Sequence, residues 1–150
     1  MGAHVIKAGL SPVVIDLMAE GFVSAVVLNG AGLIHDYEMA LAGATSEDVD
    51  AVLGQGKFGM SEETGRGLNG IIASGVEAGM GIGQSVAAHF AATPPPFAGV
   101  SLLAAAAKFA IPVTVHVAVG TDIIHMHPAA SGRALGEGSL RDFRYLTSSV

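Results

Sequence analysis

Two short apolar runs rich in β-branched side chains stand out along the chain, at residues 22–28 and 113–119. Short, mostly apolar runs of this kind are typical of strands buried on both faces, as in parallel sheets. Helical patterns lie between them, so we expect parallel strands joined by right-handed crossovers in an α/β fold. Residues 123–126 are a third, weaker strand candidate.

Capping signals place helices around these strands. Ser11-Pro12 begins a helix that Gly21 ends, and Gly43 ends a helix that begins at Leu33. Glycines recur too often between residues 65 and 83 for a helix to be predicted there. The remaining predicted helices cover residues 45–53, with a Thr45/Asp48 capping box, 98–109 and 139–150, and another begins at Ser61-Glu62-Glu63.

The 150 residues amount to about one domain. Thr93-Pro94-Pro95-Pro96 is a stiff, extended hinge, but apolar patterning continues on both sides of it, so it need not be a domain boundary. Two convincing strands make a poor sheet. We therefore expect residues 1–150 to form one partial, Rossmann-like nucleotide-binding α/β domain, a parallel sheet with flanking helices. Its incomplete sheet suggests a piece of a longer protein, or a protomer whose sheet is completed by other material.

Composition excludes several classes of function. Hydrophobic residues make up 51% of the chain and charged residues 13%, which excludes intrinsic disorder. The net charge is -6 and the basic residues are scattered, so neither a nucleic acid nor an anionic membrane surface is an expected partner. The chain has no cysteine, which excludes disulfides and thiolate metal sites and fits a reducing compartment. No signal peptide is recognisable in the first ten residues, so we expect a cytoplasmic protein.

The apolar stretch at residues 97–119 is long enough to raise the question of a membrane span. Lys108 and Pro112 lie within it. A spanning helix would bury the Lys108 ammonium near mid-bilayer and lose a backbone hydrogen bond at Pro112. We therefore interpret the stretch as a buried helix followed by a buried strand.

Ligands of open parallel sheets collect beyond the carboxyl ends of the strands. The first such end is Asn29-Gly30-Ala31-Gly32, which leads into a helix that carries His35 and Asp36. Glycines there would let the backbone approach a phosphate or ribose, and the helix dipole favours an anion. The alternative is a tight strand-to-helix turn without a ligand. His35 could act as a general acid or base at the rim or simply lie at the surface, whereas Asp36 is interpreted as a first-turn acid.

The second strand end is Gly120-Thr121-Asp122, followed by a polar loop that reaches Glu137-Gly138-Ser139. The loop contains His125 and His127, whose spacing could hold a metal from a strand. His116 and Asp122 are possible further ligands, which would suit a metal-dependent hydrolase. A histidine pair on one face of a strand, without metal, is equally natural.

The order of these pieces resembles the nucleotide-binding core of deoxyhypusine synthase. The similar segments are Ala3-His4-Val5-Ile6-Lys7-Ala8-Gly9, the helix ending in Leu17-Met18, the strand and turn through Asn29-Gly30-Ala31-Gly32, Leu33-Ile34-His35-Asp36, Ile111-Pro112-Val113, and Glu137-Gly138-Ser139-Leu140-Arg141-Asp142. The resemblance covers roughly the first 45 and the last 40 residues.

The resemblance implies a fold that binds NAD, usually in a homotetramer, so we expect a homo-oligomer. It implies that Asp142 occupies the place of an acid that holds the amine substrate. Our own hypothesis for the chemistry is that the cofactor takes a hydride while His35 or His125 moves a proton. The implied cofactor-binding residues are His4 and Lys7 in a first loop, Asn29, Gly30, Ala31 and Gly32 in a second, and Glu137, Gly138 and Ser139 on the far side.

Two departures from the family shape the expected function. Ile34 and His35 stand where the family has two adjacent carboxylates that hold a polyamine, and the family's nucleophilic lysine lies in a segment this chain does not contain. We therefore expect an NAD-dependent transferase or oxidoreductase acting on an amine-type small molecule, and not a true deoxyhypusine synthase. The alternatives are the metal-dependent hydrolase and a non-catalytic oligomeric module.

Overall fold

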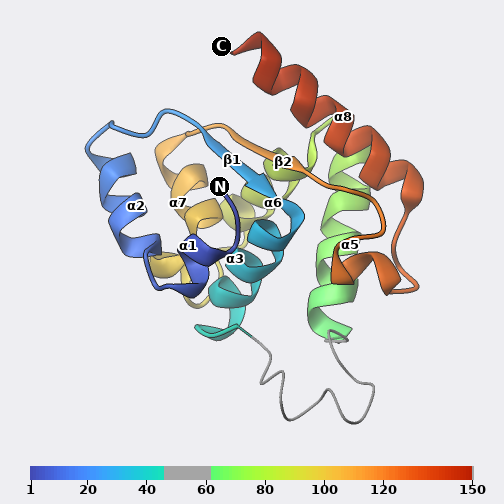
Figure 1. Ribbon diagram of the computed structural model, residues 1–150, viewed down its shortest axis with the longest axis horizontal. Coiled ribbons are helices and arrows are strands. Elements are labelled where there is room, and N and C mark those ends of the chain that lie inside the picture. Colours follow the sequence, from blue (N-terminus) through green and yellow to red (C-terminus); the bar gives the residue numbers. More distant parts are fainter. Residues whose placement is uncertain (46–61, 150) are drawn as a thin grey trace.

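The computed structural model describes residues 1–45 and 62–149. They form a mostly helical α/β structure around a small parallel sheet (Figure 1). The elements are α1 (His4–Lys7), α2 (Ser11–Ala19), β1 (Val26–Asn29), α3 (Gly30–Ala42), α5 (Glu62–Glu77), α6 (Ile82–Ala92), the 3-10 turn η1 (Ala98–Val100), α7 (Leu102–Phe109), β2 (Val113–His116), the 3-10 turn η2 (Ile123–Met126) and α8 (Gly132–Ser148). The helix predicted over residues 45–53 lies outside the described residues, apart from Thr45.

The sheet consists of β1 and β2, which pair in parallel from Val26↔Val113 to Asn29↔His116. Both strands are shorter than the apolar runs that predicted them. Phe22 is 79% exposed, so the first part of its run does not enter the sheet. A full Rossmann sheet is not formed by the described residues.

Side chains of α8 close the outer edge of β2. The backbone N–H of Val115 donates to Asp142 Oδ2 at 2.8 Å, and that of Val117 donates to Ser139 Oγ at 3.3 Å. These amides point away from β1, where a further strand would otherwise accept from them. Side chains of α8 therefore accept the hydrogen bonds at this edge, where we expected a strand from other material.

Helices cover the sheet and extend to either end of the molecule (Figure 1). Contacts join α3 to β1, and α6 and α8 to β2, while α7 packs on α6 and α2. The core includes Leu28, Leu33, Val86, Leu103 and Val115, none of which is more than 1% exposed. Within the described residues, no helix combines the length and the apolar character needed to cross a membrane.

Helix α5 begins at Glu62, where a helix is predicted to start, and continues to Glu77 through residues for which the recurring glycines left no helix predicted. It contains four glycines in 16 residues, and α6 follows at Ile82. A Cβ on Gly65 would lie 2.6 Å from the ring of His127, and Cβ atoms on Gly67 and Gly75 would overlap Tyr37 and Ser85. Glycine costs about 1 kcal/mol relative to alanine in a helix, but here it allows close packing.

Other elements also differ from the prediction, among them α3, which begins at Gly30 and not at Leu33. Residues 123–126 form a 3-10 turn and not a strand, because Asp122 and His125 cap it reciprocally. Helix α8 begins at Gly132, seven residues before the predicted start, where Ser131 Oγ accepts from the N–H of Ala134. Helix α7 begins at Leu102 after the separate turn η1, and not at residue 98.

Asp36 is buried, contrary to its interpretation as a first-turn acid. It is 0% exposed, and its carboxylate accepts from Ser101 Oγ at 2.7 Å and from the N–H groups of Leu102 and Leu103 at 2.7 and 3.0 Å. Burial raises the pKa of Asp36, although these hydrogen bonds oppose the rise. Asp36 therefore ties the N-terminus of α7 to α3.

Candidate functional site

The carboxyl ends of β1 and β2 lie at the same edge of the sheet, because Asn29 and His116 are partners in the parallel register. The chain passes from Asn29 directly into α3, and from His116 through a loop to η2. Ser139, which accepts from Val117, lies on the opposite side of the same end of β2. The two segments predicted to bind a cofactor therefore reach one edge, which we call the carboxyl edge.

The turn after β1 is partly occupied by the protein itself. Asn29 caps α3, and its Oδ1 accepts from the N–H of Gly32 at 2.8 Å. The Gly32 amide is therefore not unpaired, contrary to our expectation. The carboxylate of Asp122 lies so close to Gly30 that a Cβ there would overlap it. Only glycine permits this approach, and it places an acid of the chain at the positive end of the α3 dipole.

Asp122 and His125 hold each other in a fixed geometry. His125 Nδ1 accepts from the backbone N–H of Gly120 at 3.1 Å and from that of Asp122 at 3.3 Å, so we assign the ring proton to Nε2. Nε2 is buried without a hydrogen-bond partner, and it lies 4.0 Å from Asp122 Oδ2. Desolvation raises the pKa of Asp122, and the nearby imidazole of His125 opposes the rise. Nε2 is thus a buried donor 4.0 Å from the carboxylate that covers Gly30.

The N-terminal segment approaches the same edge. A Cβ on Gly2 would lie 3.7 Å from Asn29 Nδ2, and the Met1 ammonium donates to the carbonyl of Val27. His4 and Lys7, the other predicted cofactor residues, belong to the short helix α1, which packs on α3, and both are exposed. The first predicted cofactor loop is therefore a helix, although it lies next to the end of β1.

Glu137 and Gly138 face a different part of the molecule. Glu137 binds Arg141, whose guanidinium also donates to the carbonyl of Val76 at 2.6 Å. A Cβ on Gly138 would lie 2.8 Å from Ile82 and 2.9 Å from Val76. These two residues pack α8 against α5 and α6, so of the three predicted in this segment only Ser139 faces the carboxyl edge.

His35 lies on α3 and pairs with Glu38. Its Nδ1 is 3.6 Å from Glu38 Oε2 and has no hydrogen-bond partner. The carboxylate of Glu38 also accepts from the Thr64 hydroxyl at 3.4 Å. The two histidines predicted to move a proton thus have different acidic neighbours, Glu38 for His35 and Asp122 for His125.

The predicted metal ligands do not assemble. His116 Nε2 lies 3.1 Å from Thr114 Oγ1, and His127 Nε2 lies 3.0 Å from Glu62 Oε2. Only Asp122 and His125 of the four are close together. No group of three His, Asp or Glu side chains in residues 1–45 and 62–149 could hold a metal ion. The described geometry does not support the proposed ligand set of the metal-dependent hydrolase.

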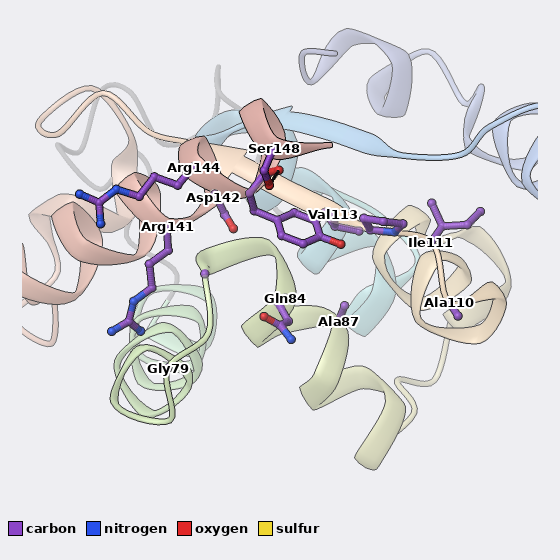
Figure 2. A pocket seen from close by; sticks show the side chains of 13 residues that line it. Gly79, Gln84, Ala87, Ala110, Ile111, Val113, Arg141, Asp142, Arg144 and Ser148 are labelled. Atoms are coloured by element: carbon purple, nitrogen blue, oxygen red, sulfur yellow. Dashed lines mark hydrogen bonds between the residues drawn. The ribbon is translucent and has the colours of Figure 1, made fainter. Parts of the chain in front are cut away.

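Asp142, predicted to hold an amine, lines a cavity of about 520 Å³ between α6, α8 and the connection from α7 to β2 (Figure 2). Its Oδ2 accepts from the N–H groups of Gly83 and Val115 at 2.9 and 2.8 Å. Burial nevertheless raises the pKa of Asp142. The structure thus gives Asp142 a role in joining α8, α6 and β2, and binding of an amine stays a prediction.

The rest of this cavity wall combines polar and apolar groups. Gln84 lies on the α6 side and Arg144 on the α8 side, while Ile111 and Val113 form part of an apolar wall (Figure 2). Val113 is the first residue of β2. The cavity therefore lies toward the amino end of β2, away from the carboxyl edge.

Sequence reasoning missed the contact of Asp122 with Gly30. The signal was present, since Asp122 follows the end of a strand and acids in such positions bind ribose hydroxyls in dinucleotide-binding folds.

Comparison of the chain with protein-family models gives no match, and comparisons with curated proteins and with solved structures give none either.

Proposed function

We propose that this protein binds a nucleotide cofactor of the NAD class at the carboxyl edge, as part of an NAD-dependent transferase or oxidoreductase. The contact between Gly30 and Asp122 carries the proposal. It joins the glycine turn after one parallel strand to an acid beyond the end of its neighbour. Nucleotides bind beyond the carboxyl ends of parallel strands in doubly wound folds, with an acid on the ribose.

The occupied Gly32 amide and the carboxylate of Asp122 favour a ribose over a phosphate at this position. A phosphate at the first turn of α3 would meet the carboxylate of Asp122, and the Gly32 N–H already donates to Asn29. Phosphate and carboxylate repel each other, whereas ribose hydroxyls donate hydrogen bonds to a carboxylate. We therefore place a ribose against Asp122, with the diphosphate away from the first turn of α3.

The groups around this position can also serve chemistry. A bound nicotinamide would supply hydride transfer. His125 presents a fixed Nε2–H, which can donate a hydrogen bond to a ligand oxygen after a small local movement. The proposal of an amine-type substrate and of a homo-oligomer rests on the resemblance to the deoxyhypusine synthase family.

Calorimetric titration with NAD, NADH, adenosine and inorganic pyrophosphate tests this proposal. Asp122→Asn should weaken NAD and adenosine binding about tenfold to a hundredfold, the range for losing a hydrogen bond to a charged group. Pyrophosphate alone should not compete with NAD. Gly30→Ala should also weaken binding, because its Cβ displaces Asp122.

Asp16→Asn and Gly136→Ala are the matched controls. Asp16 is an exposed acid on α2, and a Cβ on Gly136 meets nothing within 4 Å. Neither should change affinity. Absence of NAD binding by the folded wild-type protein would refute the proposal, and so would equal affinity in wild type and Asp122→Asn.

A further inference from the structure

A cavity of about 460 Å³ lies between α2, α6, η1 and α7. Its wall is formed by apolar side chains and one glycine, apart from Lys108, the only charged residue that lines it. Ile15 contributes from α2, Phe90 from α6 and Ala107 from α7. The volume is within the range of small-molecule sites, about 300–1,000 Å³.

The small side chains of α7 create this space. Ala104, Ala105 and Ala107 face it, so methyl groups stand where larger side chains would otherwise fill the contact between helices. The cavity is partly open to solvent, so much of its apolar wall faces water. An apolar ligand chain would remove this surface from water, which is favourable.

Lys108 gives the cavity its one charge. It lies in the last turn of α7, is exposed, and holds its Nζ 5.2 Å from the centroid of the Phe109 ring. In the part of the chain that the structure describes, no carboxylate lies within ion-pair distance of this ammonium. Aromatic contact and the partial negative charge at the end of α7 balance it only in part.

We propose that this cavity binds a single-chain carboxylate amphiphile of the medium-chain fatty acid class. Its hydrocarbon chain lies against Ile15, Phe90 and the α7 alanines, and its carboxylate pairs with Lys108. Apart from Lys108, the lining offers no polar side chain for the hydroxyls of a sugar, and its one cation matches the single charge of a carboxylate better than the higher charge of a phosphate. This site is independent of the nucleotide proposed at the carboxyl edge.

Calorimetric titration of the full chain with decanoate and with decanol tests this assignment. Decanoate should bind one molecule per chain, and more tightly than decanol. Lys108→Gln should weaken decanoate binding about tenfold and leave decanol unchanged, because only the carboxylate uses the ammonium. Ala107→Leu should weaken binding of both ligands, because the larger side chain occupies part of the cavity.

Thermal unfolding tests whether Ala107→Leu weakens binding by narrowing the cavity or by destabilising the fold. Ala107→Leu should unfold at the same temperature as wild type or higher, since it adds apolar contacts. The controls are Ala88→Leu, at an exposed position on α6, and Arg133→Gln, at an exposed position on α8. Both should bind decanoate like wild type.

Three outcomes would overturn the assignment. The first is no decanoate binding by the folded protein, and the second is decanoate binding that neither Lys108→Gln nor Ala107→Leu changes. The third is a dimer in light scattering that Ala107→Leu dissociates, which would identify a second copy of the chain as the occupant.

Discussion

Replacement of Asp36 should destabilise the protein more than a typical single substitution. Asp36→Ala leaves the amides of Leu102 and Leu103 without their acceptor at the buried N-terminus of α7. An unsatisfied buried donor costs about 1–3 kcal/mol, so two cost about 2–6 kcal/mol. Removal of a desolvated carboxylate, whose pKa is raised by burial, returns part of this cost. We expect a net loss of about 3 kcal/mol, a large part of the roughly 5–15 kcal/mol that stabilises a domain.

Urea unfolding followed by circular dichroism measures this loss. Asp36→Asn keeps one acceptor oxygen and should lose less than Asp36→Ala, while Asp16→Asn at an exposed position of α2 should remain within about 0.5 kcal/mol of wild type. The raised pKa adds a pH signature. Because the pKa of Asp36 is higher in the folded protein, Asp36 ionises more readily in the unfolded chain. Wild type should therefore lose stability relative to Asp36→Asn as the pH rises from about 4 through the folded-state pKa. Equal stability of Asp36→Ala and wild type would refute the assignment of Asp36 to the cap of α7.

Three further predictions concern stability, each measurable by chemical or thermal unfolding. Gly75→Ala should destabilise the protein by about 1–3 kcal/mol, because its Cβ overlaps Ser85. Gly70→Ala in the same helix should stabilise it by about 0.5–1 kcal/mol, because a Cβ there meets nothing within 4 Å. The reverse order would contradict the packing described for α5. Ala110→Gly should stabilise by about 1 kcal/mol, since Ala110 has φ 55° at the end of α7, and any loss of stability would show that this φ carries no strain. Hydrogen bonds from His127 and Arg66 lower the pKa of Glu62. Wild type should therefore be more stable to unfolding than Glu62→Gln above about pH 4.5, and this difference should disappear as the pH falls through the folded-state pKa of Glu62. A stability difference that persists at lower pH would exclude this linkage.

Local signals in the sequence predicted the elements whose ends they define. Helix α2 begins at Ser11, next to the predicted position, but Leu10 is its N-cap and Ser11 Oγ makes no capping hydrogen bond. Helix α3 ends before Gly43, which has φ 70°. These features depend on residues adjacent in the chain. The glycines of α5 could not be interpreted in the same way, because their packing partners, including Tyr37 and Ser85, are distant in sequence.

The candidate site was predictable in position but not in detail. Asn29 pairs with His116 at the end of the sheet and Ser139 accepts from Val117 just beyond it, so both lie near one edge. Their convergence on a common crevice stays a prediction. The sequence could not show that Asp122 covers Gly30, because that contact depends on a loop without regular structure before η2. Binding of NAD stays a prediction.

The polar side chains that α8 places along β2 also limit how this molecule can associate with others. A strand arriving at the outer edge of β2 would have to displace Asp142 and Ser139 before it could pair with the amides of Val115 and Val117. Exposed strand edges are common starting points for unwanted aggregation, and proteins block them with helices and charged groups. On the β1 side the carbonyl of Val27 already accepts from the Met1 ammonium, so a strand arriving there would have to displace the amino terminus.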